Sequence, residues 1–358
     1  MMRRSSERVP DKASEGRLLE LRREAEKRGK VESVGIRASG APFPRATPET
    51  GYYGTPLLKE PQWNWAIPLY FFVGGAAGSS SVIGSMAGWL GHDPKLARDA
   101  RFIAAGGAAL SGALLIYDLG RPRRFLNMLR VFKLQSPMSM GAWTLAGFGT
   151  SSAAAAFADL VEAKYGKSLP VSVVGGLGRS FSAAFGLPFS NYTGVLIGAT
   201  TIPVWNKNVR TLPIHFGASG LQSAVSLLEL VGHDESRALQ ILGVIAATTE
   251  TLQGLLIEGE RGPENRPLKR GGSGWMIRIG GVLSGPLPLA LRLFGGSKMR
   301  RWAAWSGLVG SLATRYAWMH AGHISARDWR IPLDIPEEAA QAPSRLQVAP
   351  ERELRAVG

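Results

Sequence analysis

The sequence contains no cysteine among its 358 residues. Disulfide bonds, zinc–thiolate sites and cysteine-ligated iron–sulfur clusters are therefore excluded within this chain. Charged residues are scarce, at 19% of the chain, and a large share of them lies in the first sixty residues. Beyond Pro61 the sequence consists of apolar runs rich in glycine and alanine. A soluble domain of this length would carry more charge and show clearer amphipathic periods, so these shortages indicate a membrane protein.

The net charge of +15 raises the alternative of a protein that binds nucleic acid. Outside the first sixty residues, however, the basic residues lie mostly in short connections between apolar runs. This distribution is typical of membrane proteins, and we expect membrane lipid rather than nucleic acid as the surroundings. The basic loops, together with the basic N-terminal tail, weakly favour cytoplasmic termini.

Eight segments are predicted to cross the membrane as helices, which places both termini on one side. Their predicted ranges are 66–90, 97–118, 141–161, 191–205, 212–230, 238–257, 275–294 and 302–323. Residues 162–189, with Arg179, Pro188 and many glycines, are predicted as an interfacial or re-entrant loop. The fold class is therefore all-α, a polytopic membrane protein. Polar tails are expected at 1–60, partly disordered or docking a partner, and at 326–358.

The segment 117–132 is dense in charge between two apolar runs. Gly120 is suited to a left-handed helix cap, and Pro122 to the first turn of a new helix. A short helix lying in the membrane interface is therefore predicted from Pro122. An ordinary positive loop that sets topology is the alternative. The sharper interpretation is that Asp118 and the neighbouring arginines border a polar pocket at the membrane edge.

Three stretches of the chain resemble the NrfD / polysulfide-reductase membrane-subunit family. They are "GYYGTPLLKEPQWNWAIPLYFFVGGAAGSS" (51–80), "DLGRPRRFLNMLRVFKLQSPMSMGAW" (118–143) and "NYTGVLIGATTIPVW" (191–205). Weaker matches follow in the same order, "LPIHFGASGLQSA" (212–224) and "AGHISARD" (321–328). The resemblance covers roughly residues 51–328.

The resemblance implies two four-helix bundles, here residues 61–206 and 207–325, in the bacterial inner membrane. It implies a subunit that exchanges electrons between menaquinone or ubiquinone and a ferredoxin-like iron–sulfur partner. That partner would serve a catalytic subunit, often a molybdopterin enzyme. The quinone pocket is expected in the first bundle, near the face that meets the iron–sulfur protein.

A quinone site needs an apolar slot for the ring, polar groups for the carbonyl oxygens and a path for protons. Tyr70 aligns with a family position that is a histidine in some members, whereas Ile67 stands where asparagine is common. Trp63 and Trp65 are equally consistent with anchoring at the membrane interface. The candidate quinone-binding residues are Trp63, Trp65, Tyr70, Asp118, Arg121, Trp205 and Asn206.

Ionisable residues inside later spans are costly in lipid and usually face a helix bundle's interior. Glu229, Glu250 and Arg315, with Asp118 at the rim, are candidates for a proton path; helix-end snorkelling or a structural ion pair is the alternative. A haem b between two of the histidines His215, His320 and His323 is geometrically possible. Ordinary polar residues at span ends are the favoured interpretation, and no motif for a redox metal is present, so electrons must come from a partner.

Two other functions compete with a quinone-linked electron-transfer subunit. One is a membrane anchor or a redox-linked proton-translocating subunit in which quinone chemistry is secondary. The other is a secondary transporter. The transporter is disfavoured because the sequence shows neither an inverted repeat nor paired helices broken by glycine and proline.

Overall fold

The computed structural model describes residues 58–91, 93–120, 122–328 and 331–332, together with Arg23 and two short strands. The strands β1 (Val31–Glu32) and β2 (Gly35–Ile36) pair in an antiparallel ladder. The tail predicted at 1–60 and the polar end of the chain lie almost entirely outside the described residues.

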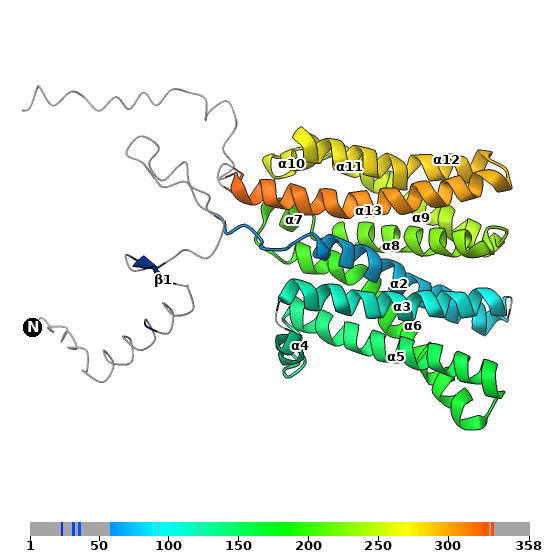
Figure 1. Ribbon diagram of the computed structural model, residues 1–358. Helices are drawn as coiled ribbons and strands as arrows, with labels where there is room; N and C mark the ends of the chain where they lie inside the picture. Colours follow the sequence, from blue (N-terminus) through cyan, green and yellow to red (C-terminus); the bar gives the residue numbers. More distant parts are fainter. Residues whose placement is uncertain are drawn as a thin grey trace, which may run out of the picture. The chain divides into compact units, whose positions relative to one another are not determined.

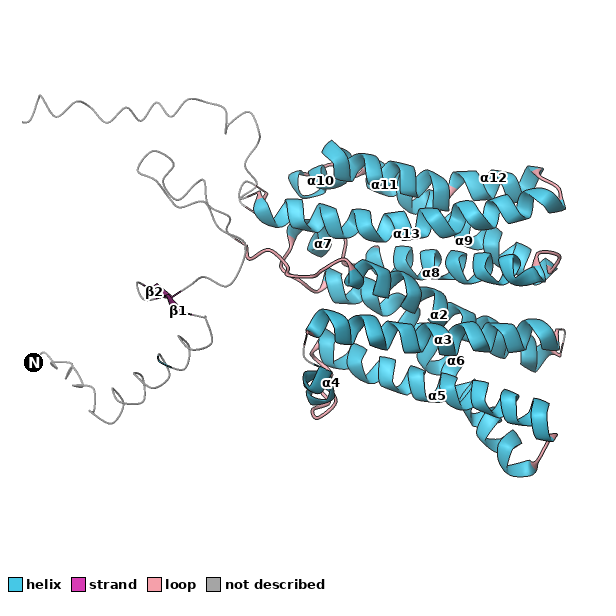
Figure 2. Ribbon diagram, in the orientation of Figure 1, coloured by secondary structure: helices cyan, strands magenta, loops and turns pink. Residues whose placement is uncertain are grey.

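Long helices lie side by side through the rest of the described chain, with their axes roughly parallel or antiparallel (Figures 1 and 2). The long helices up to residue 198 are called the first group, and the long helices from residue 212 onward the second group. The first group comprises α2 (Ala66–Leu90), α3 (Pro94–Leu119), α5 (Pro137–Tyr165) and α6 (Leu169–Gly198). The second comprises α8 (Leu212–Leu228), α9 (Arg237–Gly259), α11 (Gly271–Ser284), α12 (Pro286–Phe294) and α13 (Ser297–Arg327). Shorter helical pieces are α4 (Pro122–Met128), α7 (Pro203–Lys207), the π-helix η2 (Glu229–His233), η3 (Pro263–Asn265) and α10 (Arg266–Lys269).

Among the described residues, four stretches of helix are long and apolar enough, by length and composition, to cross a membrane. They are α2, α3, α9 and the stretch Gly271–Phe294 that joins α11 and α12. Large apolar side chains are exposed on the helices, among them Trp89, Phe157, Trp275, Phe294 and Trp302. A soluble protein would bury more of this surface, whereas lipid can cover it.

Small residues set the distances between helices. Helix α2 packs against α3, α6 and α8. Where α2 crosses α8, a Cβ on Gly75 would lie 3.3 Å from the Cα of Gly220. Where α2 crosses α6, a Cβ on Gly186 would overlap the Ser81 hydroxyl. The small residues therefore bring α2 close to both groups, as is common between helices in lipid.

The loop predicted at 162–189 is wrong, because α6 runs unbroken from Leu169 to Gly198. Glycine and proline disfavour helices in water, which is why this stretch resembled a loop. In the packed protein, Pro188 lies inside the helix, and the glycines allow close contact with α5. A Cβ on Gly178, for example, would lie 2.8 Å from the backbone nitrogen of Ala155.

Three other predicted spans differ from the observed helices. The span predicted at 191–205 is the end of α6 followed by the separate helix α7. The span at 212–230 passes into the π-helix η2, and the span at 275–294 breaks at Gly285 between α11 and α12. The cap at Gly120, with φ 67°, and a short helix starting at Pro122 are both confirmed.

Candidate functional site

A cavity of about 240 Å³ lies within the first group, at the end where α2 begins and α3 ends. Its walls are mainly aromatic and aliphatic, and α2, α3, α4, α5 and α6 all contribute to them. Three of the residues predicted from the sequence line this one cavity, namely Trp63, Tyr70 and Asp118. The other lining residues are Ile67, Phe71, Leu115, Leu119, Met128, Met138, Gly141, Ala142, Tyr192 and Leu196.

Tyr70 and Asp118 supply polar atoms to this apolar space. The Tyr70 side chain is buried, and its hydroxyl makes no hydrogen bond with any other described residue. Asp118 is half-buried, and its Oδ1 accepts a hydrogen bond of 3.3 Å from the backbone N–H of Asn64. That bond holds the carboxylate at the rim, where the carboxylate can exchange protons with water.

Trp63 separates the cavity from a second hollow on the outer surface. Its ring stacks on Trp205, with centroids 5.6 Å apart, and meets Phe71 edge-on at 6.4 Å. Trp205 is fully buried, and its indole N–H donates to the Trp318 carbonyl oxygen at 2.9 Å. The outer hollow, of about 320 Å³, is lined by Lys59, Glu60, Pro61, Gln62, Trp63, Thr200, Thr201, Ile202 and Trp205.

The outer hollow is fixed by an ion-pair cluster between the segment before α2 and the end of α13. Glu60 Oε1 lies 2.8 Å from His323 Nδ1 and 2.7 Å from Arg327 Nη2. Its second oxygen accepts a hydrogen bond from Arg327 Nε at 3.0 Å. His323, predicted to be an ordinary polar residue at a span end, therefore has a specific partner in Glu60, which the sequence pattern does not reveal.

The remaining predicted quinone residues lie elsewhere. Trp65 is exposed, and its ring contacts Tyr117 on the outer surface at 5.6 Å. Asn206 is exposed, and its amide donates to the carbonyl oxygen of Thr200 at 3.2 Å. Trp205 does not line the cavity but stacks on Trp63, which does. Arg121 lies outside the described residues.

Tyr192 is a cavity residue that sequence reasoning missed. Its hydroxyl donates to the Pro137 carbonyl oxygen at 2.5 Å, which holds the ring across α5. The ring passes over Gly141, where a Cβ would overlap it. The pair could have been noticed only as a tyrosine and a glycine in two of the stretches that carry the family resemblance. Ile67, the departure from the family pattern, also lines the cavity, so this wall is apolar here.

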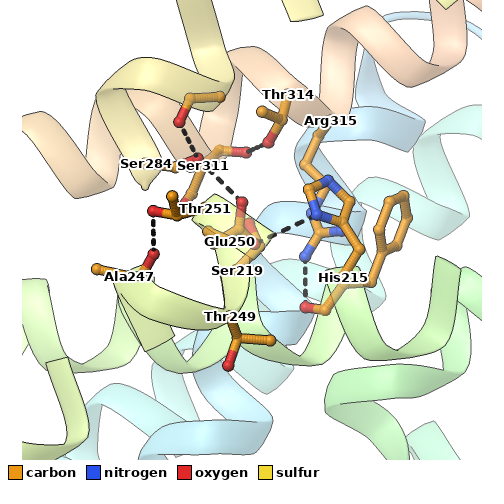
Figure 3. Close-up of polar contacts among 12 residues, drawn as sticks. His215, Ser219, Ala247, Thr249, Glu250, Thr251, Ser284, Ser311, Thr314 and Arg315 are labelled. Atoms are coloured by element: carbon orange, nitrogen blue, oxygen red, sulfur yellow. Dashed lines mark hydrogen bonds and ion pairs between the residues drawn. The ribbon is translucent and has the colours of Figure 1, made fainter. Parts of the chain in front are cut away.

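A second cluster of polar residues is buried in the second group (Figure 3). Glu250 accepts a hydrogen bond from the Ser284 hydroxyl at 2.9 Å, and its other oxygen lies 3.5 Å from His215 Nδ1. The Arg315 Nη2 donates to the Phe216 carbonyl oxygen at 2.7 Å, and its guanidinium lies over the Phe216 ring. Figure 3 shows the side chains of His215, Glu250 and Arg315 directed toward one another.

Five polar residues form a stripe along α8 and into η2. They are His215, Ser219, Gln222, Ser226 and Glu229, which alternate spacings of four and three and so share one helix face. All five are buried. The first four have side-chain atoms without a hydrogen-bond partner in the described protein. Buried water molecules in proteins typically bind to such unsatisfied polar atoms. We call this set the α8 stripe; its spacing was visible in the sequence but was not recognised.

Glu229 ends the α8 stripe in a buried ion pair. The two carboxylate oxygens lie 2.5 and 2.7 Å from the two terminal nitrogens of Arg292 on α12. The two partners are almost wholly buried. One turn further on, His233 Nε2 lies 2.9 Å from Asp99 on α3. Of the predicted proton-path residues, Glu229, Glu250 and Arg315 are therefore all buried in the second group, and Asp118 is at the cavity instead.

The histidines considered for haem lie in different surroundings. His215 is buried beside Glu250, whereas His320 is exposed and His323 binds Glu60. Within the described ranges, no group of three or more histidine, aspartate or glutamate side chains is placed to hold a metal ion.

Comparisons with known proteins place this geometry in a family context. Residues 58–241, slightly more than half of the chain, match the family model described as polysulphide reductase, NrfD. The polysulfide reductase C chain of Wolinella succinogenes is 27% identical over 196 residues. That similarity covers 48% of this chain and 58% of the relative's own length. The matched region contains every residue that lines the cavity between α2 and α6.

Proposed function

The chain belongs to the polysulphide reductase NrfD family, and on that premise we propose that it exchanges electrons and protons between a membrane quinone and a partner iron–sulfur protein. Family membership and the long apolar helices identify an integral membrane protein. The partner would connect it to a catalytic subunit, often a molybdopterin enzyme, in a respiratory complex of the bacterial inner membrane. The proposed quinone is menaquinone or ubiquinone.

Eight crossings in two bundles of four are part of this proposal. The first bundle is the first group, and the second is α8, α9, the broken helix α11–α12, and α13. The exposed apolar side chains on these helices support the arrangement. The cavity and the outer hollow lie at the end where α2 begins and α13 ends, which the basic residues favour as cytoplasmic.

The cavity lined by Trp63, Tyr70 and Asp118 is the observation that carries the quinone proposal. Its volume of about 240 Å³ is slightly below the roughly 300–1,000 Å³ of pockets for drug-sized ligands, so it fits a ring rather than a whole isoprenoid quinone. The flat walls of Trp63 and Phe71 suit an aromatic ring. A bound quinol supplies two electrons and two protons.

Two side chains are placed to handle the carbonyl oxygens and protons. The Tyr70 hydroxyl, free of protein partners among the described residues, would donate a hydrogen bond to a ring oxygen. Asp118 would accept a proton from the ring hydroxyl on its Oδ2 while Asn64 N–H holds Oδ1. Because Asp118 is half-buried at the end of α3, the proton can then leave to water.

Trp63 would separate the quinone from the partner by a single ring. It lines the cavity and the outer hollow alike, and it stacks on Trp205. An iron–sulfur protein docked over the outer hollow would therefore approach the cavity at Trp63. This docking position would give the electrons a short route. The partner has to hold the iron–sulfur cluster, because this chain carries no cysteine that could bind one.

Binding of a quinone-site inhibitor to the purified chain tests the proposal. Tyr70→Phe removes one hydroxyl and keeps the ring, so affinity should fall by about tenfold, as for the loss of one hydrogen bond. Tyr117→Phe is the matched control, since Tyr117 is exposed on α3 outside the cavity and should leave affinity unchanged. Asp118→Asn should slow quinol oxidation by the assembled complex. Equal inhibitor affinity in the native protein, Tyr70→Phe and Tyr117→Phe would reject the assignment of Tyr70.

A second function, redox-linked proton movement, is favoured by the α8 stripe. Its buried polar atoms, with Glu250 and Arg315 beside them, offer hydrogen-bonding groups through the second group. In the assembled complex in sealed vesicles, Glu250→Gln should abolish proton release per electron while quinol oxidation continues. Glu258→Gln, on the exposed part of the same helix, is the control. A membrane anchor without such a path would be indifferent to both changes.

A further inference from the structure

A third hollow lies at the other end of the first group, away from Asp118. It measures about 620 Å³ and is bounded by the end of α2, the start of α3, the end of α5 and the first half of α6. Nothing in the proposed quinone chemistry uses it. Because α2 and α3 run in opposite directions between the two ends, the hollow and the quinone cavity lie on opposite sides of the proposed membrane.

A rigid ion-pair network forms the inner wall of this hollow. Asp159 binds Arg101 through one oxygen at 2.5 Å and Arg179 through the other at 3.0 Å. Glu162 lies 3.7 Å from Arg179 and accepts a hydrogen bond from Ser172. The Arg179 Nε is buried without a partner in the described protein. Two arginines and two carboxylates balance here, so the wall holds a fixed set of guanidinium N–H donors.

The outer part of the hollow carries positive charge that the network does not neutralise. Lys167 lines it, and an adjoining hollow of about 320 Å³ adds Lys95 and Arg98. Together the two hollows have five basic side chains against the carboxylates of Asp159 and Glu162. No ion pair to either lysine is formed within the described part of the chain, and Arg98 is half-exposed beside Asp99. The chemistry therefore suits an anion with several oxygen acceptors.

The surroundings of the hollow are apolar and exposed. Trp89, at its edge, is 63% exposed, as expected for an aromatic side chain at a membrane interface. The adjacent stretches of α5 and α6 expose Phe157, Leu160, Leu177 and Phe181. The charged headgroup of an anionic lipid could therefore bind in the hollow while its acyl chains contact the apolar side chains on α5 and α6.

We propose that this hollow binds the phosphate headgroup of an anionic phospholipid such as phosphatidylglycerol. Arg179 and Lys167 would contact the phosphate oxygens, Lys95 and Arg98 would supply further attraction, and the acyl chains would lie along α5 and α6. Basic pockets between membrane helices bind anionic headgroups on the cytoplasmic side, and the same contacts are offered here to a headgroup of the opposite leaflet. The proposal depends on the chain lying in a membrane, and it does not depend on quinone being the ligand at the opposite end.

Native mass spectrometry of the full chain, purified with phosphatidylglycerol and phosphatidylcholine in equal amounts, measures retained lipid directly. The native protein should keep phosphatidylglycerol in preference to phosphatidylcholine. The variant K95Q/R98Q/K167Q removes three charges outside the ion-pair network, and its phosphatidylglycerol retention should fall about tenfold or more. Its unfolding temperature in phosphatidylcholine should stay unchanged, because none of these side chains is buried in the core.

A matched control removes three exposed positive charges from the opposite end, as R130Q/K207Q/R210Q. This variant should retain phosphatidylglycerol like the native protein. Equal loss in both variants would show nonspecific attraction and overturn the proposal, as would the absence of any preference in the native protein. Displacement of the lipid by millimolar inorganic phosphate would also overturn it, in favour of a free-phosphate site.

Discussion

The cavity of the first group and the interior of the second group hold polar atoms in opposite ways. The first group surrounds a small cavity whose walls are aromatic and whose polar atoms, at Tyr70 and Asp118, face open space. The second group is filled by its own charged side chains, with the Glu229–Arg292 pair and the Glu250–His215 contact inside. Polar atoms beside a cavity can meet a ligand, whereas polar atoms enclosed between packed helices can only exchange protons, bind internal water or stabilise the fold.

The family match follows the same division. Residues 58–241 contain the whole first group and the α8 stripe, but not Glu250, Arg292 or Arg315. The cavity therefore lies wholly in the part of the chain that matches the family, while the polar interior of the second group is completed by residues outside the match. We expect substitutions in the second group to affect folding most and substitutions around the cavity to affect binding most.

Breaking the buried ion pair should have the largest effect. Arg292→Met leaves Glu229 without its partner in the interior and should destabilise the protein by about 3–5 kcal/mol. The double variant E229Q/R292M removes both charges and should recover much of that loss. Thermal unfolding in one detergent measures both. A double variant as unstable as the single one would show that the loss does not come from leaving the Glu229 charge unpaired.

The second-largest effect is expected from adding a methyl group at Gly141, against the ring of Tyr192. Gly141→Ala places a Cβ against the Tyr192 ring, so it should cost about 1–3 kcal/mol and weaken binding of a quinone-site inhibitor. Gly149→Ala on the same helix is the control, because nothing lies within 4 Å of its Cβ. That change should be neutral or slightly stabilising. Unfolding temperature and inhibitor affinity, measured together, separate the two effects.

Removing the aromatic wall should affect binding more than stability. Trp63→Leu takes away the stacking on Trp205 and one face of the cavity, so inhibitor affinity should fall about tenfold, or roughly 1.4 kcal/mol. Titration of inhibitor into the purified variant measures this. An unchanged affinity would indicate that Trp63 only anchors the chain at the interface.

The smallest effect on stability is expected from protonating Glu60 at the outer hollow in acid. Burial raises the pKa of Glu60, but its hydrogen bonds to Arg327 and His323 outweigh burial and hold the pKa below the ordinary 4.5. The stabilisation is therefore complete above pH 4.5 and is lost as the pH falls through the lower folded-state pKa. Glu60→Gln should lower the unfolding temperature near neutral pH by a small amount, and the difference should shrink in acid. A difference that grows in acid would contradict this sign.

The fold was predictable where apolar length alone decides the structure. The range 66–90 equals α2, and 238–257 falls within α9 by one or two residues at each end. Residues 162–189 failed because glycine and proline have opposite meanings in a flexible loop and in a tight contact between helices. Only the neighbouring helix α5 tells them apart, and a sequence read alone does not show it.

The candidate site was predictable only in part for a similar reason. Trp63, Tyr70 and Asp118 belong to stretches with a specific resemblance, and the structure brings them to one cavity. Trp65 precedes the buried Ala66 and Asn206 follows the buried Trp205, yet that single step turns their side chains outward. Tyr192 and the Arg292 partner of Glu229 depend on contacts between segments far apart in the chain, which local patterns do not reveal.

Photoaffinity labelling with an azido-quinone, followed by peptide mass spectrometry, tests the central assignment most directly. The assignment predicts label on peptides of α2, α3 and α6 that contain Tyr70, Asp118 or Tyr192, and competition by unlabelled quinone. Competed labelling confined to α8, α9 or α13 would contradict it.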